Sequence, residues 1–291
     1  MDFLDGFVPH LIGGLAYGLL LFTVASGLTL AFGVADVLNL AHGTFFAVGG
    51  YAAFVMSDGS WTGLLLAVLV GALAGALFGS GLSVAVAPLA KRGHMAQALL
   101  TFGISLVVGH LLVVAFGASY KRPVLPDALS GPVTIGGHHY SAYHLLFIGF
   151  ASILAIVGWL IITKSRVGAL VRAMVDDRQM VAAIGTSPRL VLGGVLTVAG
   201  AVAGLAGALG APILGPGPNT ANVVLMQSLI IVVVGGLGSV GGAFIAALAV
   251  GQVHTFGVAL APDWTPYLLF GAMAVALLVR KPPPLLLGGR T

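Results

Sequence analysis

The sequence predicts an all-α fold: a polytopic integral membrane helical bundle of about eight to nine transmembrane helices, some of them broken or re-entrant. Three observations predict it: 59% of the 291 residues are hydrophobic, only 7% are charged, and the mean hydropathy is +1.11. Soluble domains carry about 25% charged residues. The few charges here cannot cover a soluble surface of this size. We therefore expect residues 1–291 to form a single membrane domain.

A helix that crosses the membrane needs roughly 17 to 25 mostly apolar residues. The stretches that approach this length and composition are residues 11–32, 41–56, 63–90, 95–119, 143–163, 190–214, 221–234, 242–260 and 266–279. The second, seventh and ninth are short. Glycine or polar residues fill the breaks at 33–39 and 235–242. Paired short or broken segments are typical of half-helices beside a transport site.

Basic residues divide unequally between the two sides of these spans. With the N-terminus outside, only Lys121 and Arg122 fall outside the cell, and the other Lys and Arg are cytoplasmic. The cytoplasmic set is Lys91, Arg92, Lys164, Arg166, Arg172, Arg178, Arg189, Arg280, Lys281 and Arg290. The positive-inside rule favours this arrangement. We expect the N-terminus outside and the C-terminus in the cytoplasm.

Glycines recur at helical spacing within several spans. The sets are Gly14 with Gly18, Gly71 with Gly75 and Gly79, and Gly200 with Gly204. Small residues four positions apart let two helix backbones approach closely in lipid. These glycines are expected to form packing faces and to carry no chemistry.

The residue types exclude several functions. The chain has no Cys and no Glu, so thiolate metal sites and paired glutamates are absent. Every Asp falls in an expected loop, with Asp36 the one ambiguous case. The spans therefore offer few ionisable side chains that could couple transport to an ion gradient. No Gly-Lys-Ser/Thr phosphate-binding motif is present. The energy for transport is therefore expected to come from a partner. The basic pI near 9.6 reflects basic residues beside the spans, and nucleic-acid binding is not expected.

Two weak motifs suggest chemistry without supporting it. His138, His139 and His144 cluster near an external loop, but no carboxylate or thiol accompanies them at a matching spacing, so a hydrated loop is favoured over a metal site. The glycines from Gly236 to Gly241 match Gly-x-Gly-x-x-Gly, but no strand precedes them and no acidic residue follows about 20 positions later. No Gly-x-Ser-x-Gly nucleophile motif occurs. An enzyme is not expected.

The break after the first span carries Asp36, Asn39 and His42. One interpretation is a polar patch that lines a conduit or holds the unwound chain. The other is a cytoplasmic turn in which Asn39 caps the next helix. Both stay open for Asn39 and His42, and the turn is favoured for Asp36.

Residues 164–189 form the one long cytoplasmic segment and are expected to fold as short amphipathic helices. Apolar residues recur there near helical spacing, at Leu170, Met174, Val181 and Ile184. Gly185 is a helix stop, and Ser187 with Pro188 opens the next span. The acidic pair Asp176 and Asp177 suits a protein groove better than anionic lipid headgroups. Docking to a partner protein is therefore favoured.

Taken in order, several motifs resemble the permeases of branched-chain amino acid ATP-binding-cassette (ABC) importers, of the LivH type, over nearly the whole chain. They are Gly27-Leu-Thr-Leu-Ala-Phe-Gly33, Asn39-Leu-Ala-His-Gly43, Thr101-Phe-Gly-Ile-Ser105, Arg172-Ala173 with Asp177 and Gly185, and Gly235-Gly-Leu-Gly-Ser-Val-Gly-Gly242. The resemblance implies a multi-pass subunit of the bacterial inner membrane. It would translocate leucine, isoleucine and valine by alternating access.

The resemblance also implies partners and site residues. The partners are a second permease subunit, identical or homologous, two cytoplasmic ATP-binding subunits and an extracytoplasmic solute-binding protein, all beside the lipid bilayer. ATP and Mg would be bound by those subunits, with no cofactor in this chain. The implied ATPase-coupling residues are Arg172, Ala173, Asp177 and Gly185. Our candidates for the translocation pathway and its broken helices are Asn39, His42, Gly43, Gly235, Gly236, Gly238, Gly241 and Gly242.

Three positions depart from the pattern of that family: Gly109, Gly241 and His254. They leave the cargo open, because importers of urea and short amides resemble the same permeases. A channel or facilitator that works alone is the alternative from another class, and it would not need the cytoplasmic segment.

Overall fold

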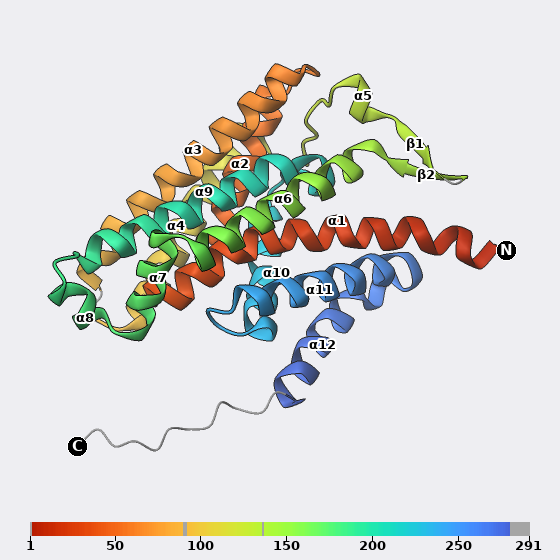
Figure 1. The fold of residues 1–291 in the computed structure, drawn as a ribbon. Coiled ribbons are helices and arrows are strands. Elements are labelled where there is room, and N and C mark those ends of the chain that lie inside the picture. The colour runs from red at the N-terminus through yellow and green to blue at the C-terminus, as the bar shows by residue number, and fades with distance from the viewer. Residues whose placement is uncertain (1, 90–91, 136, 280–291) are drawn as a thin grey trace.

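The computed structural model describes residues 2–89, 92–135 and 137–279, and these form a helical bundle with one short hairpin (Figure 1). The long helices are α1 (Asp2–Leu30), α2 (His42–Met56), α3 (Trp61–Val86), α4 (His94–Phe116), α6 (Ala142–Lys164), α9 (Pro188–Leu214), α10 (Thr220–Gly235), α11 (Val240–Leu260) and α12 (Thr265–Val279). The short elements are η1 (Ala31–Ala35), η2 (Ala87–Leu89), α5 (Asp127–Ser130), β1 (Pro132–Ile135), β2 (His138–Ser141), α7 (Arg166–Asp176), α8 (Arg178–Ala183) and η3 (Pro262–Trp264).

Each of the expected spans corresponds to one of these long helices, so the all-α membrane bundle is confirmed. Six helical stretches in the described part of the chain are long and apolar enough to cross a membrane. They are Phe7–Ala35, Trp61–Leu89, His94–Phe116, Ala142–Lys164, Pro188–Leu214 and Val240–Leu260. The three spans expected to be short are α2 and α12, with 15 residues each, and α10, with 16.

The expected helix breaks are shifted. The first helix does not stop at Gly33, because η1 is a π-helical turn that continues α1 to Ala35, and the break covers residues 36–41. The glycine-rich break is also shorter than expected. Because α10 runs through Gly235 and α11 begins at Val240, Gly235, Gly241 and Gly242 are helical, and only residues 236–239 form the turn.

The loop between α4 and α6 contains two strands that the sequence does not predict. β1 and β2 pair antiparallel, with Pro132 opposite Ser141 and Val133 opposite Tyr140. The Gly-Gly dipeptide at 136–137 is a hairpin signal that could have identified them. In Figure 1 the hairpin and the start of α1 lie at one end of the bundle, and α7 and α8 lie at the opposite end.

The glycine faces are packing faces, as predicted. The backbones of α3 and α9 touch: a methyl group added at Gly200 would clash with the carbonyl oxygen of Gly75, and one at Gly204 with that of Gly71. On α1, a methyl group at Gly18 would lie 2.9 Å from the Ala247 carbonyl oxygen of α11. Bilayer lipid gives helices little hydrophobic reason to associate, so such close packing is what holds them together.

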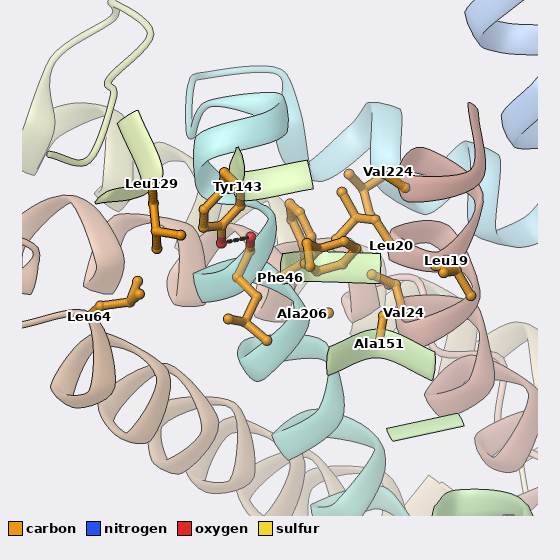
Figure 2. Packing of buried hydrophobic residues seen from close by; sticks show 13 residues of the cluster. Leu19, Leu20, Val24, Phe46, Leu64, Leu129, Tyr143, Ala151, Ala206 and Val224 are labelled. Carbon is orange, nitrogen blue, oxygen red and sulfur yellow. Dashed lines mark hydrogen bonds between the residues drawn. The ribbon is translucent and has the colours of Figure 1, made fainter. Parts of the chain in front are cut away.

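Larger side chains fill the centre of the bundle where α1, α2, α9 and α10 meet. Phe46 is 1% exposed and packs in one cluster with Leu20, Val24 and Val224 (Figure 2). The Tyr143 hydroxyl of α6 donates a hydrogen bond to the Leu209 carbonyl oxygen over 2.5 Å, drawn as a dashed line in Figure 2. The first turns of α2 therefore pack against a closely filled interior.

Candidate transport and coupling sites

The second helix starts inside the bundle. After η1 the chain turns at Asp36, a non-glycine residue in the left-handed region with φ of 55°, and runs back without helical structure to α2. The His42 Nε2 then lies 2.9 Å from the carbonyl oxygen of Val24, well inside the span of α1. α2 is therefore a half-helix whose N-terminus lies among the other helices. Irregular backbone at this depth requires partners within the protein.

Helix α4 supplies those partners. The Thr101 hydroxyl donates to the Leu38 carbonyl oxygen and accepts from the Leu40 amide, both over 3.0 Å. One turn further along α4, the hydroxyl of Ser105 lies 2.7 Å from that of Thr44 in the first turn of α2. Two of the motifs quoted above, 39–43 and 101–105, are thus in direct contact.

The structure brings Asn39, His42 and Gly43 together at this point. Asn39 is 1% exposed and His42 is 0% exposed, so neither lies in a solvated turn. Asn39 is also not the cap of α2: its Oδ1 accepts from the Ala41 amide over 3.0 Å, and Ala41 occupies the cap position. Gly43 lies so close to α10 that a methyl group there would clash with the Ala221 carbonyl oxygen.

Asp36 lies in the turn, as favoured. Its side chain is 62% exposed, and its carboxylate is 3.7 Å from the His94 imidazole at the start of α4. The break therefore has an exposed charged end at Asp36 and a buried polar end at His42.

The glycine-rich turn lies elsewhere. Gly236 and Gly238 have φ of 99° and 79°, a region that favours glycine, and Ser239 caps α11 by accepting from the Gly242 amide over 3.1 Å. The turn contacts η1, because a Cβ added at Gly33 would lie 2.6 Å from the Gly238 Cα. It adjoins the element that precedes the break, whereas Asn39, His42 and Gly43 lie where α2 begins.

Segment 164–189 forms two short helices, α7 and α8, as predicted. Asp177 caps α8, its carboxylate accepting from the amides of Gln179 at 2.8 Å and Met180 at 3.0 Å. Gly185, with φ of 85°, ends that helix. Arg172 ties α7 to the end of α6 by donating to the Ile162 carbonyl oxygen.

The expected apolar face is correct at Met174 and Val181, which are 0% and 2% exposed, and wrong at Ile184, which is 70% exposed. Ile184 lies beyond the end of α8, so helical spacing no longer determines its direction. With Met180 and Val175 it leaves an apolar surface exposed on this segment. Ala173, next to Met174, is only partly exposed.

Segment 164–189 is joined to the break through η1. Arg178 donates to the carbonyl oxygen of Val34 over 3.3 Å. The Val34 side chain is buried in one cluster with Met174 and Val181. A displacement of α7 and α8 would therefore act directly on the turn that leads into the broken segment.

Polar residues of α4 were missed as site residues. Gln97, Thr101 and Ser105 recur every four positions along an otherwise apolar helix, and they are 5%, 0% and 8% exposed. A polar stripe on a membrane helix points into the protein. This periodicity was visible in the sequence and could have paired α4 with the break.

No group of three or more metal-ligating side chains lies close together in the part of the chain that the structure describes. Of the histidines near the hairpin, His139 uses its Nδ1 in a hydrogen bond of 3.0 Å with the Thr134 hydroxyl.

The spans, the broken helix α2 and the two short helices of segment 164–189 define a multi-pass membrane protein. Residues 10–278 match the family described as Branched-chain amino acid transport system / permease component, and the chain belongs to this family of ABC transporter permeases. Permease subunits of the family are not themselves catalytic and bind no cofactor.

Three relatives show the extent of the similarity. The chain is 24% identical over 290 residues to the high-affinity branched-chain amino acid transport system permease protein BraD of Pseudomonas aeruginosa, covering 94% of each chain. It is 26% identical over 291 residues to the permease protein LivH of Escherichia coli strain K12, covering 94% of this chain and 93% of the relative. It is also 26% identical to LivM of that strain, covering 89% and 66%. No solved structure matches the chain significantly.

Proposed function

We propose that this chain is the membrane-spanning subunit of an ABC importer that translocates leucine, isoleucine and valine across the plasma membrane by alternating access. Relatives similar over nearly their whole length are named as branched-chain amino acid permeases.

The observation that carries the proposal is the connection from Arg178 to Val34. The cytoplasmic segment 164–189 is the coupling loop in this proposal, with Arg172, Ala173, Asp177 and Gly185 as its coupling residues. Its exposed apolar residues, Val175, Met180 and Ile184, suit docking into a groove of a cytoplasmic ATPase subunit. Closure of the ATPases would move α7 and α8, and the movement would pass through η1 to the break.

The break is the proposed gate of the translocation pathway. A helix N-terminus carries partial positive charge, which suits the carboxylate of an amino acid. The N-termini of α2 and α10 meet at Gly43 and Ala221. The apolar interior around them suits an aliphatic side chain. The glycine-rich turn at 236–239 lies against η1 through Gly238 and Gly33. Gly236 and Gly238 in this turn, with Gly235, Gly241 and Gly242 in the helix ends beside it, would allow that region to shift.

The orientation proposed from charge is N-terminus outside and C-terminus inside, in a bacterial inner membrane. The placement of α7 and α8 at the end opposite the N-terminus and the hairpin supports it (Figure 1). Four of the residues assigned to the cytoplasm, Lys91, Arg280, Lys281 and Arg290, lie outside the described residues. The proposed partners are a second permease, two ATPase subunits and an external solute-binding protein.

Labelled leucine uptake tests the proposal. Vesicles would hold this chain with its partner permease, ATPases and binding protein, with and without ATP on the ATPase side. ATP-dependent accumulation of leucine is expected. Equilibration without ATP would indicate a facilitator, and ATP-dependent uptake of urea in place of leucine would keep the importer and change its cargo.

A further inference from the structure

A polar cavity of about 260 Å³ lies at the coupling end of the bundle. It is bounded by the start of the break, the end of α3, the start of α4, helix α8 and the start of α9. Its charged and amide-bearing residues are Asp36, His94, Gln97, Arg178 and Arg189. None of the functional roles proposed above uses this cavity.

The cavity offers donors on one side. Arg178 and Arg189 both line it. Within the described residues, the Arg178 guanidinium donates one hydrogen bond, to the Val34 carbonyl oxygen, which leaves its other N–H groups available. The Arg189 side chain has no hydrogen-bond or ion-pair partner in that same part of the chain. Two guanidinium groups beside one cavity suit a carboxylate, which they can bind through paired hydrogen bonds.

It also offers acceptors. Gln97 is 5% exposed, and its Oε1 is buried with no hydrogen-bond partner in the structure. A buried amide oxygen without a partner is unfavourable, so a ligand that donates a hydrogen bond there would be stabilised. The Asp36 carboxylate lines the same cavity and supplies the negative charge that a cationic donor requires.

The remaining wall is apolar. Val37, Val86, Leu192 and Leu196 line it. Val86 and Leu196 belong to one buried cluster with Val37, so this wall is part of the packed core of the bundle. A ligand with an aliphatic portion would be covered on this side.

We propose that the cavity binds a zwitterionic α-amino acid with an aliphatic side chain. Its carboxylate would bind to Arg178 and Arg189, its ammonium to Asp36 and the Gln97 Oε1, and its side chain would lie against Leu192 and Leu196. The site would face the cytoplasm, on the releasing side of the importer. The cytoplasmic location of the site rests on the proposed function. The class of ligand follows from the residues that line the cavity.

Occupancy of this site would affect coupling. The cavity is lined both by Arg178 of α8 and by Asp36 at the start of the break. An amino acid bound between them would hold α8 and the break in the arrangement that the structure shows. Accumulated cytoplasmic amino acid would therefore slow further import.

Equilibrium dialysis of labelled L-leucine against the purified full-length chain in nanodiscs tests the site. Two competitors share its isobutyl group: 4-methylpentanoate lacks the ammonium and 3-methylbutylamine lacks the carboxylate. Saturable leucine binding is expected, with both competitors at least about tenfold weaker, because each loses a charged hydrogen-bonded contact. Equal binding of leucine and 4-methylpentanoate would show a simple anion site and overturn the proposal.

Two variants locate the ligand. Arg189→Gln is expected to weaken leucine about tenfold, and Asp36→Asn is expected to weaken leucine but not 4-methylpentanoate. Asn tolerates the left-handed backbone at this position, so the Asp36 variant should fold. Arg122→Gln, which removes a charge outside the cavity, is the control. Unchanged leucine affinity in both variants would overturn the site.

The vesicle uptake assay separates this proposal from the proposed function. If the variants weaken leucine binding but no ATP-driven uptake occurs, the site is supported and the importer is refuted. ATP-driven leucine uptake, with binding that neither variant alters, would preserve the importer and refute the site.

Discussion

Arg178 donates a hydrogen bond to the carbonyl oxygen of Val34 across 144 positions of sequence. The contact joins helix α8 to the π-helical turn at the end of α1. If segment 164–189 is the coupling loop proposed above, a movement of that segment would reach the break through this contact.

Arg178→Gln should uncouple ATP hydrolysis from transport. The ATPase subunits should still co-purify, because the exposed apolar residues of α7 and α8 are unchanged. Leucine uptake per ATP hydrolysed should fall severalfold, since the shorter side chain no longer reaches Val34. The measurement is the ratio of uptake to phosphate release in vesicles, with Arg122→Gln as the control. An unchanged ratio would show that this contact does not transmit the movement.

Asp177→Ala should fray α8. The carboxylate satisfies two amides at the start of that helix, and loss of such a cap costs about 1 kcal/mol of local stability. Hydrogen exchange at Gln179 and Met180 should accelerate several-fold, and ATPase co-purification should weaken. Asp177→Asn keeps a capping oxygen and should exchange close to the parent rate. Equal acceleration in both variants would mean that charge, and not capping, is what matters.

Thr101→Val should destabilise the break. The substitution keeps the shape of the side chain but removes the hydroxyl that serves both Leu38 and Leu40. Each part-buried backbone group left without a partner costs about 1–3 kcal/mol. A lower Tm in detergent and reduced uptake are expected. Thr101→Ser retains the hydroxyl and should recover most of both; if it behaves like Thr101→Val, packing of the methyl group is the cause.

Gly75→Ala should disrupt the contact between α3 and α9. The added methyl group would meet the Gly200 carbonyl oxygen, and overpacking of this kind costs about 1–3 kcal/mol. Less folded protein in the membrane and a lower Tm are expected. Gly81→Ala, on the same helix with nothing within 4 Å of its added Cβ, is the matched control. Comparable losses in both variants would indicate that an added methyl group destabilises α3 whether or not it meets α9.

The sequence predicts the spans well because each lipid-facing helix has to be apolar along its whole length. It predicts the glycine packing faces of α3 and α9 for a related reason: lipid leaves close packing as the main source of helix association. That these two faces meet each other is visible only in the structure. Gly185 is predicted as a helix stop, since left-handed termination is a local property of the chain. The capping role of Asp177 is also local, but it was not predicted.

The rest depends on tertiary contacts. The π-helical turn moved the first break from Gly33 to Asp36, and no local pattern in 31–35 marks such a turn. The role of Thr101 requires knowing that α4 packs beside residues 38–40. The contact of Arg178 with Val34 cannot be read from either segment alone. For the same reason, the sequence leaves two interpretations of Asn39 open, and the capping one is wrong because Ala41 occupies the cap position of α2.

The direct backbone contact of Gly75 with Gly200 limits how an importer built on this fold could move. Two helices whose main chains touch have no space to slide past each other at that point. α3 and α9 should therefore travel as one rigid body throughout the transport cycle. α2 should travel with them, because a methyl group added at its Gly49 would clash with the Gly204 carbonyl oxygen of α9. A cross-link between α3 and α9 should leave transport intact, and opening and closing should take place at the edge of that body, where η1 and α4 meet the break.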